Sequence, residues 1–327
     1  MPRDAAPATF NPLAVSRRSG NVQSPCREPP LRLLSILLQR AAAPVAFNPI
    51  AEGRKYGPGI FLAEMRTGRI MKTMKASRDR IVSFCNAYLE ADRFKDSAPP
   101  GLQFEGSAEV KKIATGVSVS LEFLEKAAAA GASLALVHHG MFWDNDSPVI
   151  TGSRRKRIEI LVRHNMSLAA FHLPLDAHPK AGNNIQIIKR LGLKRPKSFA
   201  KYAGSPIGFY GEYRRPLDFE HFLNRVEEIF NTKSCIVFPH GKKRIASVGA
   251  VSGGAAFNFK DAIRLGLDVY ITGEAGEPVQ AWARENNIHF IAVGHHNSEK
   301  FGVQKLGELL AKKFKIPAEF IDVPNPA

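Results

Sequence analysis

Histidine is the residue whose placement in this sequence first points to chemistry. Six of the ten histidines fall in three short segments, residues 136–143, 171–178 and 294–299. Each segment follows an apolar run typical of a buried strand, and residues at the ends of strands in α/β proteins commonly line the ligand crevice. We therefore expect the three segments to converge on one site.

The first segment places His138 and His139 at the end of an apolar strand, with Gly140 leaving the backbone free to turn. The side chains of adjacent residues on a regular strand point to opposite faces. At a strand end the two imidazoles can diverge less, or each can bind one of two metals that lie side by side. A pair of hydrogen-bonded histidines at a pocket rim is the alternative.

The second segment offers Asp176 between His172 and His178. A carboxylate has two oxygens, so one side chain can bridge two cations about 3.5–4 Å apart and help to activate a shared water. The two histidines are interpreted as ligands, as donors that orient a ligand, or as substrate contacts, and the last two roles are favoured. Asn183 and Asn184 are expected to cap the helix that follows.

The third segment has His295 and Glu299 four residues apart, where a helix over 297–313 is predicted to begin. This spacing puts both side chains on one helix face and makes a bidentate chelate, with an ordinary surface His–Glu pair as the alternative. His296 then points elsewhere, toward substrate. Three imidazoles and two carboxylates without a thiolate suit Zn, Mn, Fe, Co or Ni, and the set does not choose among these metals.

Two further turns and one aromatic residue are candidates for the same site. The Val-Ser-Gly-Gly turn at 251–254 resembles a phosphate-cradling turn but lacks a P-loop ending, so a tight strand-to-helix turn is favoured over nucleotide contact. At the next strand end, Thr272 is expected to cap a helix, and Glu274 is either solvated or a general acid or base. Trp143 is equally a pocket wall or core. The candidates for proton transfer are Glu274, His296 and His172.

The elements that position these residues alternate between amphipathic stretches and short β-rich runs, which predicts an α/β fold. Helices are predicted over 77–90, 120–130, 155–164, 180–191, 218–230, 256–265, 275–286 and 297–313. Strands are predicted over 111–118, 133–137, 167–171, 206–213, 234–238, 244–251, 268–272, 288–293 and 318–323. The polar stretch Lys194–Ser205 is the expected boundary between two lobes.

Charge and composition divide the chain in two. The 327 residues carry a formal charge of +16, and residues 1–73 hold 11 Lys and Arg against 4 Asp and Glu, which leaves +9 for the rest. Residues 1–73 are rich in Pro, Ala, Arg and Ser. We predict that they are a mostly disordered extension, or that the true start of the chain is Met71 or Met74. A transit peptide is the alternative, and the run Leu31–Leu38 is expected to form a transient helix.

The remaining chain is expected to be a soluble, globular protein in a reducing compartment, the cytoplasm unless residues 1–73 are a genuine transit peptide. Its apolar runs are far shorter than the roughly 20 residues that cross a bilayer. The three cysteines, Cys26, Cys85 and Cys235, form no framework of pairs. A moderately basic surface suits an anionic ligand such as a phosphate compound, or no specific partner at all.

Several motifs together resemble a known family, the dinuclear-metal-centre proteins named after an NGG-one-interacting factor, also called GTP cyclohydrolase 1 type 2 homologues. The resemblance runs from about Ile81 to Ala327 and is weak between Lys194 and Lys243. It rests on residues 101–106, Val137–Gly140 with Phe142 and Trp143, the segments 172–184, 272–274 and 294–299, and the terminal residues 320–327, which resemble those of the short enterobacterial type.

This resemblance implies two divalent metal ions held by His138, His139, Asp176, His295 and Glu299. It also implies two α/β lobes with the site in the cleft between them, residues 74–195 plus 296–327 forming the first lobe and 196–295 the second. A toroidal homohexamer, made as a trimer of dimers, is implied as well.

Metal-assisted hydrolysis is the leading functional hypothesis, with GTP, opened at its imidazole ring, as the first substrate to test. The alternative is a non-catalytic hexameric scaffold that binds metal and interacts with nucleic acid or protein. Metal storage or insertion is a third possibility. A nucleotide or another phosphorylated small molecule is the expected ligand, and no membrane partner is expected.

Overall fold

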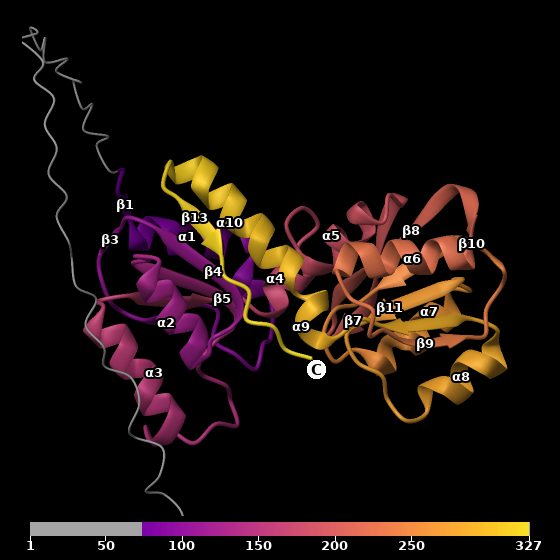
Figure 1. Ribbon diagram of the computed structural model, residues 1–327, viewed down its shortest axis with the longest axis horizontal. Helices are drawn as coiled ribbons and strands as arrows, with labels where there is room; N and C mark the ends of the chain where they lie inside the picture. Colours follow the sequence, from indigo (N-terminus) through magenta and orange to yellow (C-terminus); the bar gives the residue numbers. More distant parts are fainter. Residues whose placement is uncertain (1–73, 327) are drawn as a thin grey trace, which may run out of the picture. The chain divides into compact units, whose positions relative to one another are not determined.

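The computed structural model describes residues 74–326. The extension predicted over 1–73 and the helix predicted within it lie outside this range. Two large sheets, each covered by helices on both faces, account for most of the described chain (Figure 1). No helix among residues 74–326 is long and apolar enough to cross a membrane.

The first sheet has five strands in the order β13-β4-β5-β6-β2. Its strands are β2 (Gly101–Phe104), β4 (Ile113–Ser118), β5 (Leu134–His139), β6 (Ser167–Ala170) and β13 (Ala318–Phe320). Strands β13, β4, β5 and β6 pair in parallel, while β2 runs antiparallel at the edge. A short ladder of β1 (Ala76–Ser77) and β3 (Glu109–Val110) stands apart from this sheet.

Helices cover both faces of the first sheet, so its central strand is apolar on both sides. Leu134 and Leu136 of β5 pack with α1 (Arg78–Leu89) and α10 (Lys300–Phe314). Ala135 and Val137 pack with α2 (Leu121–Ala129) and α3 (Gly152–Arg163). These two helices lie on the opposite face of the sheet from α10 (Figure 1). This continuous apolar run is typical of a buried parallel strand.

The second sheet has six strands in the order β7-β8-β10-β11-β12-β9. Its strands are β7 (Lys194–Tyr202), β8 (Ser205–Asp218), β9 (Ile236–Pro239), β10 (Arg244–Ala250), β11 (Val269–Thr272) and β12 (His289–Ala292). The central strands β10, β11 and β12 are parallel, and the outer pairings are antiparallel.

Helices also cover both faces of this sheet. On one face lie α5 (Asn183–Arg190) and α6 (Phe219–Phe230), which pack on Val269 and Ile271 of β11. On the other lie the turn η2 (Ala256–Asn258), α7 (Phe259–Arg264) and α8 (Val279–Asn286), which surround Tyr270 of the same strand. The alternation of side chains along β11 therefore supplies both layers of core.

Local residues set where several helices begin. The hydroxyl of Ser77 accepts a hydrogen bond from the Arg80 N–H at the start of α1, and Ser120 does the same for Phe123 in α2. Asp218 accepts from the Glu220 N–H before α6. Each side chain satisfies a backbone donor that the helix itself leaves without a partner.

Several elements differ from the sequence prediction. The polar stretch expected at the lobe boundary is strand β7, which pairs with β8 as an edge hairpin; an edge position tolerates Pro196 and the flanking cations. The helix expected over 297–313 is broken into α9 (His295–Ser298) and α10, with Glu299 between them. Helix α4 (Leu173–Ala177) and strand β2 were not anticipated, because both are too short to show a period.

Candidate metal centre

The chemistry-bearing segments follow the carboxyl ends of parallel strands in both sheets. His138 and His139 end β5, and the segment with His172 and Asp176 follows β6. In the second sheet, the turn at 251–254 follows β10, Glu274 follows β11, and α9 follows β12. Contacts between these segments connect the two sheets.

Two groups of possible metal ligands share one carboxylate. His138, Asp176 and Glu299 offer atoms within 4.8 Å of one another, and so do His139, His295 and Glu299. Oε1 of Glu299 lies 3.5 Å from Nε2 of His138 and 3.2 Å from Nε2 of His295. Its Oε2 lies 3.3 Å from Nε2 of His139. Glu299 therefore stands between the two groups.

Burial makes this arrangement costly without a further partner. His138 is 0% exposed and Glu299 is 2% exposed. Among the described residues, His138 Nε2 and Glu299 Oε2 are buried side-chain atoms without a hydrogen-bond partner. A buried polar atom left unsatisfied costs about 1–3 kcal/mol. Two such atoms in the same cluster therefore indicate a place for a ligand.

The far nitrogen of each imidazole is held by a neighbour. Nδ1 of His138 lies 2.9 Å from the Phe171 carbonyl oxygen, and Nδ1 of His139 lies 2.9 Å from Oγ of Ser118. Nδ1 of His295 lies 2.5 Å from Oε1 of Glu274. Such contacts fix the ring orientation and leave Nε2 directed at the cluster, as in metal sites where an outer partner orients each histidine.

Asp176 is held in the same way. Its Oδ1 accepts hydrogen bonds from Nδ2 of Asn183 (2.8 Å) and from Oγ of Ser252 (2.9 Å). Its Oδ2 lies 3.4 Å from Nε2 of His138. Because one oxygen is already occupied, the carboxylate shared by both groups in this geometry is Glu299, whereas the sequence suggested Asp176.

The expectation that Asn183 and Asn184 cap a helix is wrong. Gly182 precedes α5, and no side chain caps that helix. Asn183 also accepts a hydrogen bond from the Gly302 N–H (2.7 Å), while Asn184 accepts from the Ser252 N–H (2.6 Å). Both amides are buried and tie α5 to the segments that carry Asp176 and Glu299.

The turn at 251–254 lies against the cluster, and Gly253 is required there. Its φ is +69°, and a Cβ atom at this position would stand 2.4 Å from Oε1 of Glu299 and 3.2 Å from Nε2 of His295. The Gly253 N–H donates to Oγ of Ser298 (2.8 Å). Only glycine combines this backbone conformation with room for the Glu299 carboxylate.

Electrostatics at the cluster favour an ionised Glu299. Burial alone would raise the pKa of Glu299, but His139, His138 and His295 outweigh it and hold that pKa well below its ordinary value. Burial lowers the pKa of His138, but the carboxylates of Asp176 and Glu299 raise it to about 9. The site is thus a buried carboxylate surrounded by imidazoles.

The other two imidazoles of the cluster differ in charge preference. Contact with Glu299, opposed by burial and assisted by Glu274, raises the pKa of His295 to about 9. Burial and the neighbouring histidines lower the pKa of His139 to about 3, so this ring is neutral over the physiological range. A neutral imidazole is the form that binds a metal.

His172 and Trp143 border the cluster. Nδ1 of His172 lies 2.8 Å from Oδ1 of Asp96, and His172 joins His138 and His139 in a third possible ligand group. The Trp143 ring meets the His172 ring edge-on, with centroids 5.1 Å apart, so this residue is a wall of the site. Asp96 was missed by sequence reasoning, since a single aspartate in a polar loop carries no distinguishing pattern.

The remaining candidates take different places. Glu274 is partly exposed, and its carboxylate contacts Nδ1 of His295. Nε2 of His296 lies 2.7 Å from Oδ1 of Asp322, and His296 is not part of the ligand groups. His178 packs on Tyr88 and accepts a hydrogen bond from the Ala181 N–H, so it stabilises a turn outside the site.

Thr272 does not cap a helix, because the next helix, α8, starts only after Pro278. Its hydroxyl donates instead to the Gly253 carbonyl oxygen.

Comparison with known proteins places this chain in a family. The model of the Duf34/NIF3 (NGG1p interacting factor 3) family matches residues 76–326, and the chain belongs to this family. The resemblance predicted from the motifs is therefore confirmed.

Individual relatives agree. The GTP cyclohydrolase 1 type 2 homolog of Haemophilus influenzae is 39% identical over 242 residues, 74% of this chain and 96% of the relative. The protein of that name from Pseudomonas aeruginosa is 38% identical over 254 residues, 78% of this chain and 100% of the relative. A solved structure described as protein ybgI, of unknown function, has a TM-score of 0.72 and 36% identity, covering 77% of this chain and 100% of that one.

Proposed function

We propose that each chain binds two divalent metal ions through His138, His139, Asp176, His295 and Glu299. The proposal rests on Glu299, a buried carboxylate shared by two groups of possible ligands. Oε2 of Glu299 and Nε2 of His138 are buried and have no hydrogen-bond partner. The donor set fits, since imidazole and carboxylate ligands without thiolate suit Zn, Mn, Fe, Co or Ni. These atoms gain partners when cations enter.

We further propose that the chain is a metal-dependent hydrolase. When bound, two divalent cations would supply Lewis acidity and lower the pKa of coordinated water. Glu274 holds His295 in place through Nδ1, and Ser118 does the same for His139. His172, held at Nδ1 by Asp96, borders the ligand cluster and is our first candidate for moving a proton to or from substrate. Glu274 and His296 are the other candidates.

GTP is the first substrate to test, because the relatives carry the name GTP cyclohydrolase 1 type 2 homolog. Hydrolytic opening of its imidazole ring consumes one water and leaves a formamide, and a second water cleaves that formamide to release formate and an amine. We expect metal-reconstituted protein to release formate from GTP, and Glu299→Gln, which keeps the shape of the side chain, to abolish this release. Equal turnover by metal-stripped protein would contradict metal-dependent hydrolysis. Cyclic amides and phosphoesters complete the substrate panel.

The same proposal includes the assembly that the family resemblance implies. The resemblance would divide the chain into two lobes, residues 74–195 plus 296–327 and residues 196–295, with the metal site in the cleft between them. Six chains would form a ring as a trimer of dimers. Sedimentation of the purified protein distinguishes a hexamer from a dimer or monomer.

One observation favours a second candidate function, a scaffold that binds nucleic acid. Helix α3 carries five basic residues against one acidic residue, namely Arg154, Arg155, Lys156, Arg157 and Arg163 against Glu159. A scaffold of this kind would bind DNA with an affinity that falls steeply with salt and survives Asp176→Asn. DNA binding that is absent at low salt would rule this candidate out.

A further inference from the structure

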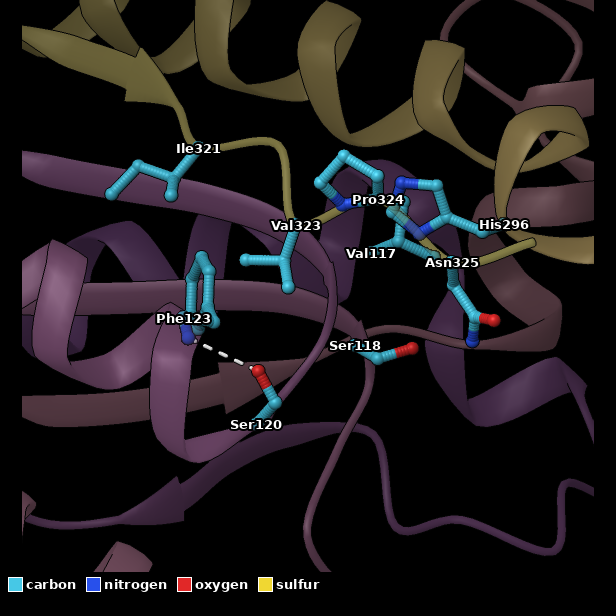
Figure 2. Close-up of a pocket in the computed structure, with 9 residues that line it drawn as sticks. All are labelled: Val117, Ser118, Ser120, Phe123, His296, Ile321, Val323, Pro324 and Asn325. Atoms are coloured by element: carbon cyan, nitrogen blue, oxygen red, sulfur yellow. Dashed lines mark hydrogen bonds between the residues drawn. The ribbon is translucent and has the colours of Figure 1, made fainter. Parts of the chain in front are cut away.

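The C-terminal segment, defined as residues 321–325, crosses the edge of the first sheet near the candidate metal centre. Strand β13 pairs in parallel with β4, and the Ile321 N–H still donates to the Thr115 carbonyl oxygen (2.8 Å). Beyond this point the chain passes over the end of β4, at Val117 and Ser118 (Figure 2). The segment therefore lies at the carboxyl edge where β5 presents its two histidines.

A pair of side chains fixes this segment in place. Oδ1 of Asp322 lies 2.7 Å from Nε2 of His296, whose side chain is only 7% exposed. Nζ of Lys300 lies 3.8 Å from Oδ2 of the same aspartate. His296 follows His295 directly, so the segment is attached to the helix that carries a candidate metal ligand.

Two adjoining cavities lie beneath and beside the segment. The inner cavity, of about 150 Å³, is bordered by Phe123, Ile321 and Val323 (Figure 2). The outer cavity, of about 210 Å³, is bordered by His139, Glu274 and His295. Both cavities share four lining residues, Val117, Ser118, His296 and Asn325. A ligand in the inner cavity can therefore extend to the candidate metal ligands.

The lining of the inner cavity indicates the chemistry of its occupant. Five of its nine lining residues are apolar, namely Val117, Phe123, Ile321, Val323 and Pro324, and polar and apolar atoms contribute comparably to the wall, with Ser120 as a polar residue on the inner side. Hydroxyl, imidazole and amide groups occur on the side shared with the outer cavity. An engineered apolar cavity of about 150 Å³ binds benzene, so this volume suits a single six-membered ring.

We propose that the inner cavity is a subsite for a planar, neutral ring of the substrate, whose carbonyl or amide group extends into the outer cavity beside the metal ligands. This inference rests on the proposed function and, within its substrate panel, favours amides carried on a ring over GTP, whose reacting imidazole carbon is not a carbonyl. The C-terminal segment forms one wall, so Val323 determines which rings fit.

Benzamide, a neutral ring with one amide, is the probe, and acetamide is the control without a ring. For nine heavy atoms the expected dissociation constant is about 1 mM, which titration followed by NMR can measure. We expect saturable binding of benzamide to the zinc-loaded protein, nuclear Overhauser contacts from its ring protons to the methyl groups of Val117 and Val323, and no saturable binding of acetamide.

Val323→Trp fills the inner cavity, and Val149→Trp, at a position that is 62% exposed, is the matched control. We expect Val323→Trp to weaken benzamide binding at least about tenfold while zinc stoichiometry stays unchanged, and Val149→Trp to bind as wild type does. Equal binding by Val323→Trp, or ring contacts to other methyl groups, would overturn the subsite.

Zinc content, measured on the same samples, separates this inference from the proposed function. Zinc binding without saturable benzamide binding overturns the subsite alone. Benzamide binding in a protein that takes up no zinc overturns the metal proposal and leaves the ring cavity without a hydrolytic role. If Val323→Trp does not fold, the contacts measured on wild type still decide between these outcomes.

Discussion

Glu299 is the residue on which the candidate centre depends. It is buried, its carboxylate faces three imidazoles, and the break between α9 and α10 places it there. Each imidazole is oriented from behind by a backbone oxygen, a hydroxyl or a carboxylate. The cluster is therefore preorganised by residues that are not themselves ligands, and these residues provide direct tests.

Glu274→Gln tests the outer contact on His295. The amide keeps the size of the side chain but removes the charge that holds the imidazole, and losing an outer partner of a metal ligand costs about 10–100-fold in metal affinity. We expect weaker zinc binding in competition with a chromophoric chelator, at unchanged thermal stability of the metal-free protein. Glu277→Gln is the matched surface control, and identical zinc affinity in both variants would contradict the role of Glu274.

Gly253→Ala tests how closely the turn approaches the carboxylate. The new methyl group would stand 2.4 Å from Oε1 of Glu299, and φ is unfavourable for alanine, so Glu299 must move. We expect reduced metal occupancy and a loss of stability of about 1–3 kcal/mol. Gly131→Ala, also at positive φ but in open space, isolates the backbone effect. Metal occupancy equal in both variants would argue against crowding at Glu299.

The five candidate ligands could be proposed from the sequence because histidines and carboxylates cluster at strand ends. Among the residues that orient the site, only Glu274 was a candidate, and then as a general acid or base. Ser118, Asn183 and Asp96 are ordinary polar residues, and only the folded chain brings Asp96 to His172 across 76 positions. The sharing of Glu299 was also out of reach, since it depends on the helix break and on Asp176 using one oxygen for Asn183 and Ser252.

At the scale of elements, Asp268 joins β10 to the loop before β11. Its carboxylate accepts hydrogen bonds from the backbone N–H groups of Ala246 and Ser247, at 2.9 and 3.0 Å, and from Nζ of Lys242 at 2.9 Å. These donors lie at the irregular pairing between β8 and β10. Asp268 thus satisfies backbone groups that the strand ladder leaves open.

A pH dependence of stability follows from Asp268. Burial alone would raise its pKa, but Lys242 and the two backbone donors outweigh burial and hold the pKa below its ordinary value. A carboxylate whose pKa is depressed by folding stabilises the protein above its unfolded pKa of about 3.9, and this contribution is lost as the pH falls through the folded value.

We expect Asp268→Asn to lower the free energy of unfolding by about 1–3 kcal/mol at pH 7, and the gap from wild type to shrink below about pH 4. Urea unfolding at several pH values measures both. Glu122→Gln, in an exposed i,i+4 pair with Lys126, is the control and should cost under about 0.5 kcal/mol. A gap that widens on acidification would contradict this assignment.

The types of the helices and strands were more predictable than their boundaries. The amphipathic and β-rich runs predicted the main helices and central strands, because buried parallel strands such as β5 and β11 are continuous apolar runs. The edge strand β7 was missed because its cations and Pro196 resemble a linker, although an edge strand needs hydrogen bonds on one side only. The division of α9 from α10 was missed because no Gly or Pro stands between His295 and Phe301 to mark it.

At the scale of the whole molecule, residues 74–326 bring two sheets together through buried polar contacts. Asn184 of α5 accepts a hydrogen bond from the N–H of Ser252, which follows β10 of the second sheet. The Ser252 hydroxyl in turn donates to Asp176, in the segment that follows β6 of the first sheet. Candidate metal ligands from both sheets then meet at Glu299. Cations bound there would hold these segments together, so metal binding and folding stability are coupled.

The coupling predicts that metal removal lowers thermal stability. One cation present at 100 times its dissociation constant adds about 2.7 kcal/mol to the folded state. We expect a chelator to lower the Tm by several degrees, and zinc to restore it in wild type but not in Glu299→Gln. An unchanged Tm after complete metal removal would show that the cluster is stable without cations.

Metal stoichiometry of the reconstituted protein tests the central proposal most directly. The purified chain is stripped with a chelator, loaded separately with zinc and manganese, passed through a desalting column and measured by elemental analysis, with Glu299→Gln alongside. We expect close to two ions per chain in wild type and fewer than one in the variant, with the same circular dichroism for both. Fewer than one ion per wild-type chain with either metal, or equal loading of Glu299→Gln, would contradict a two-metal centre that shares Glu299.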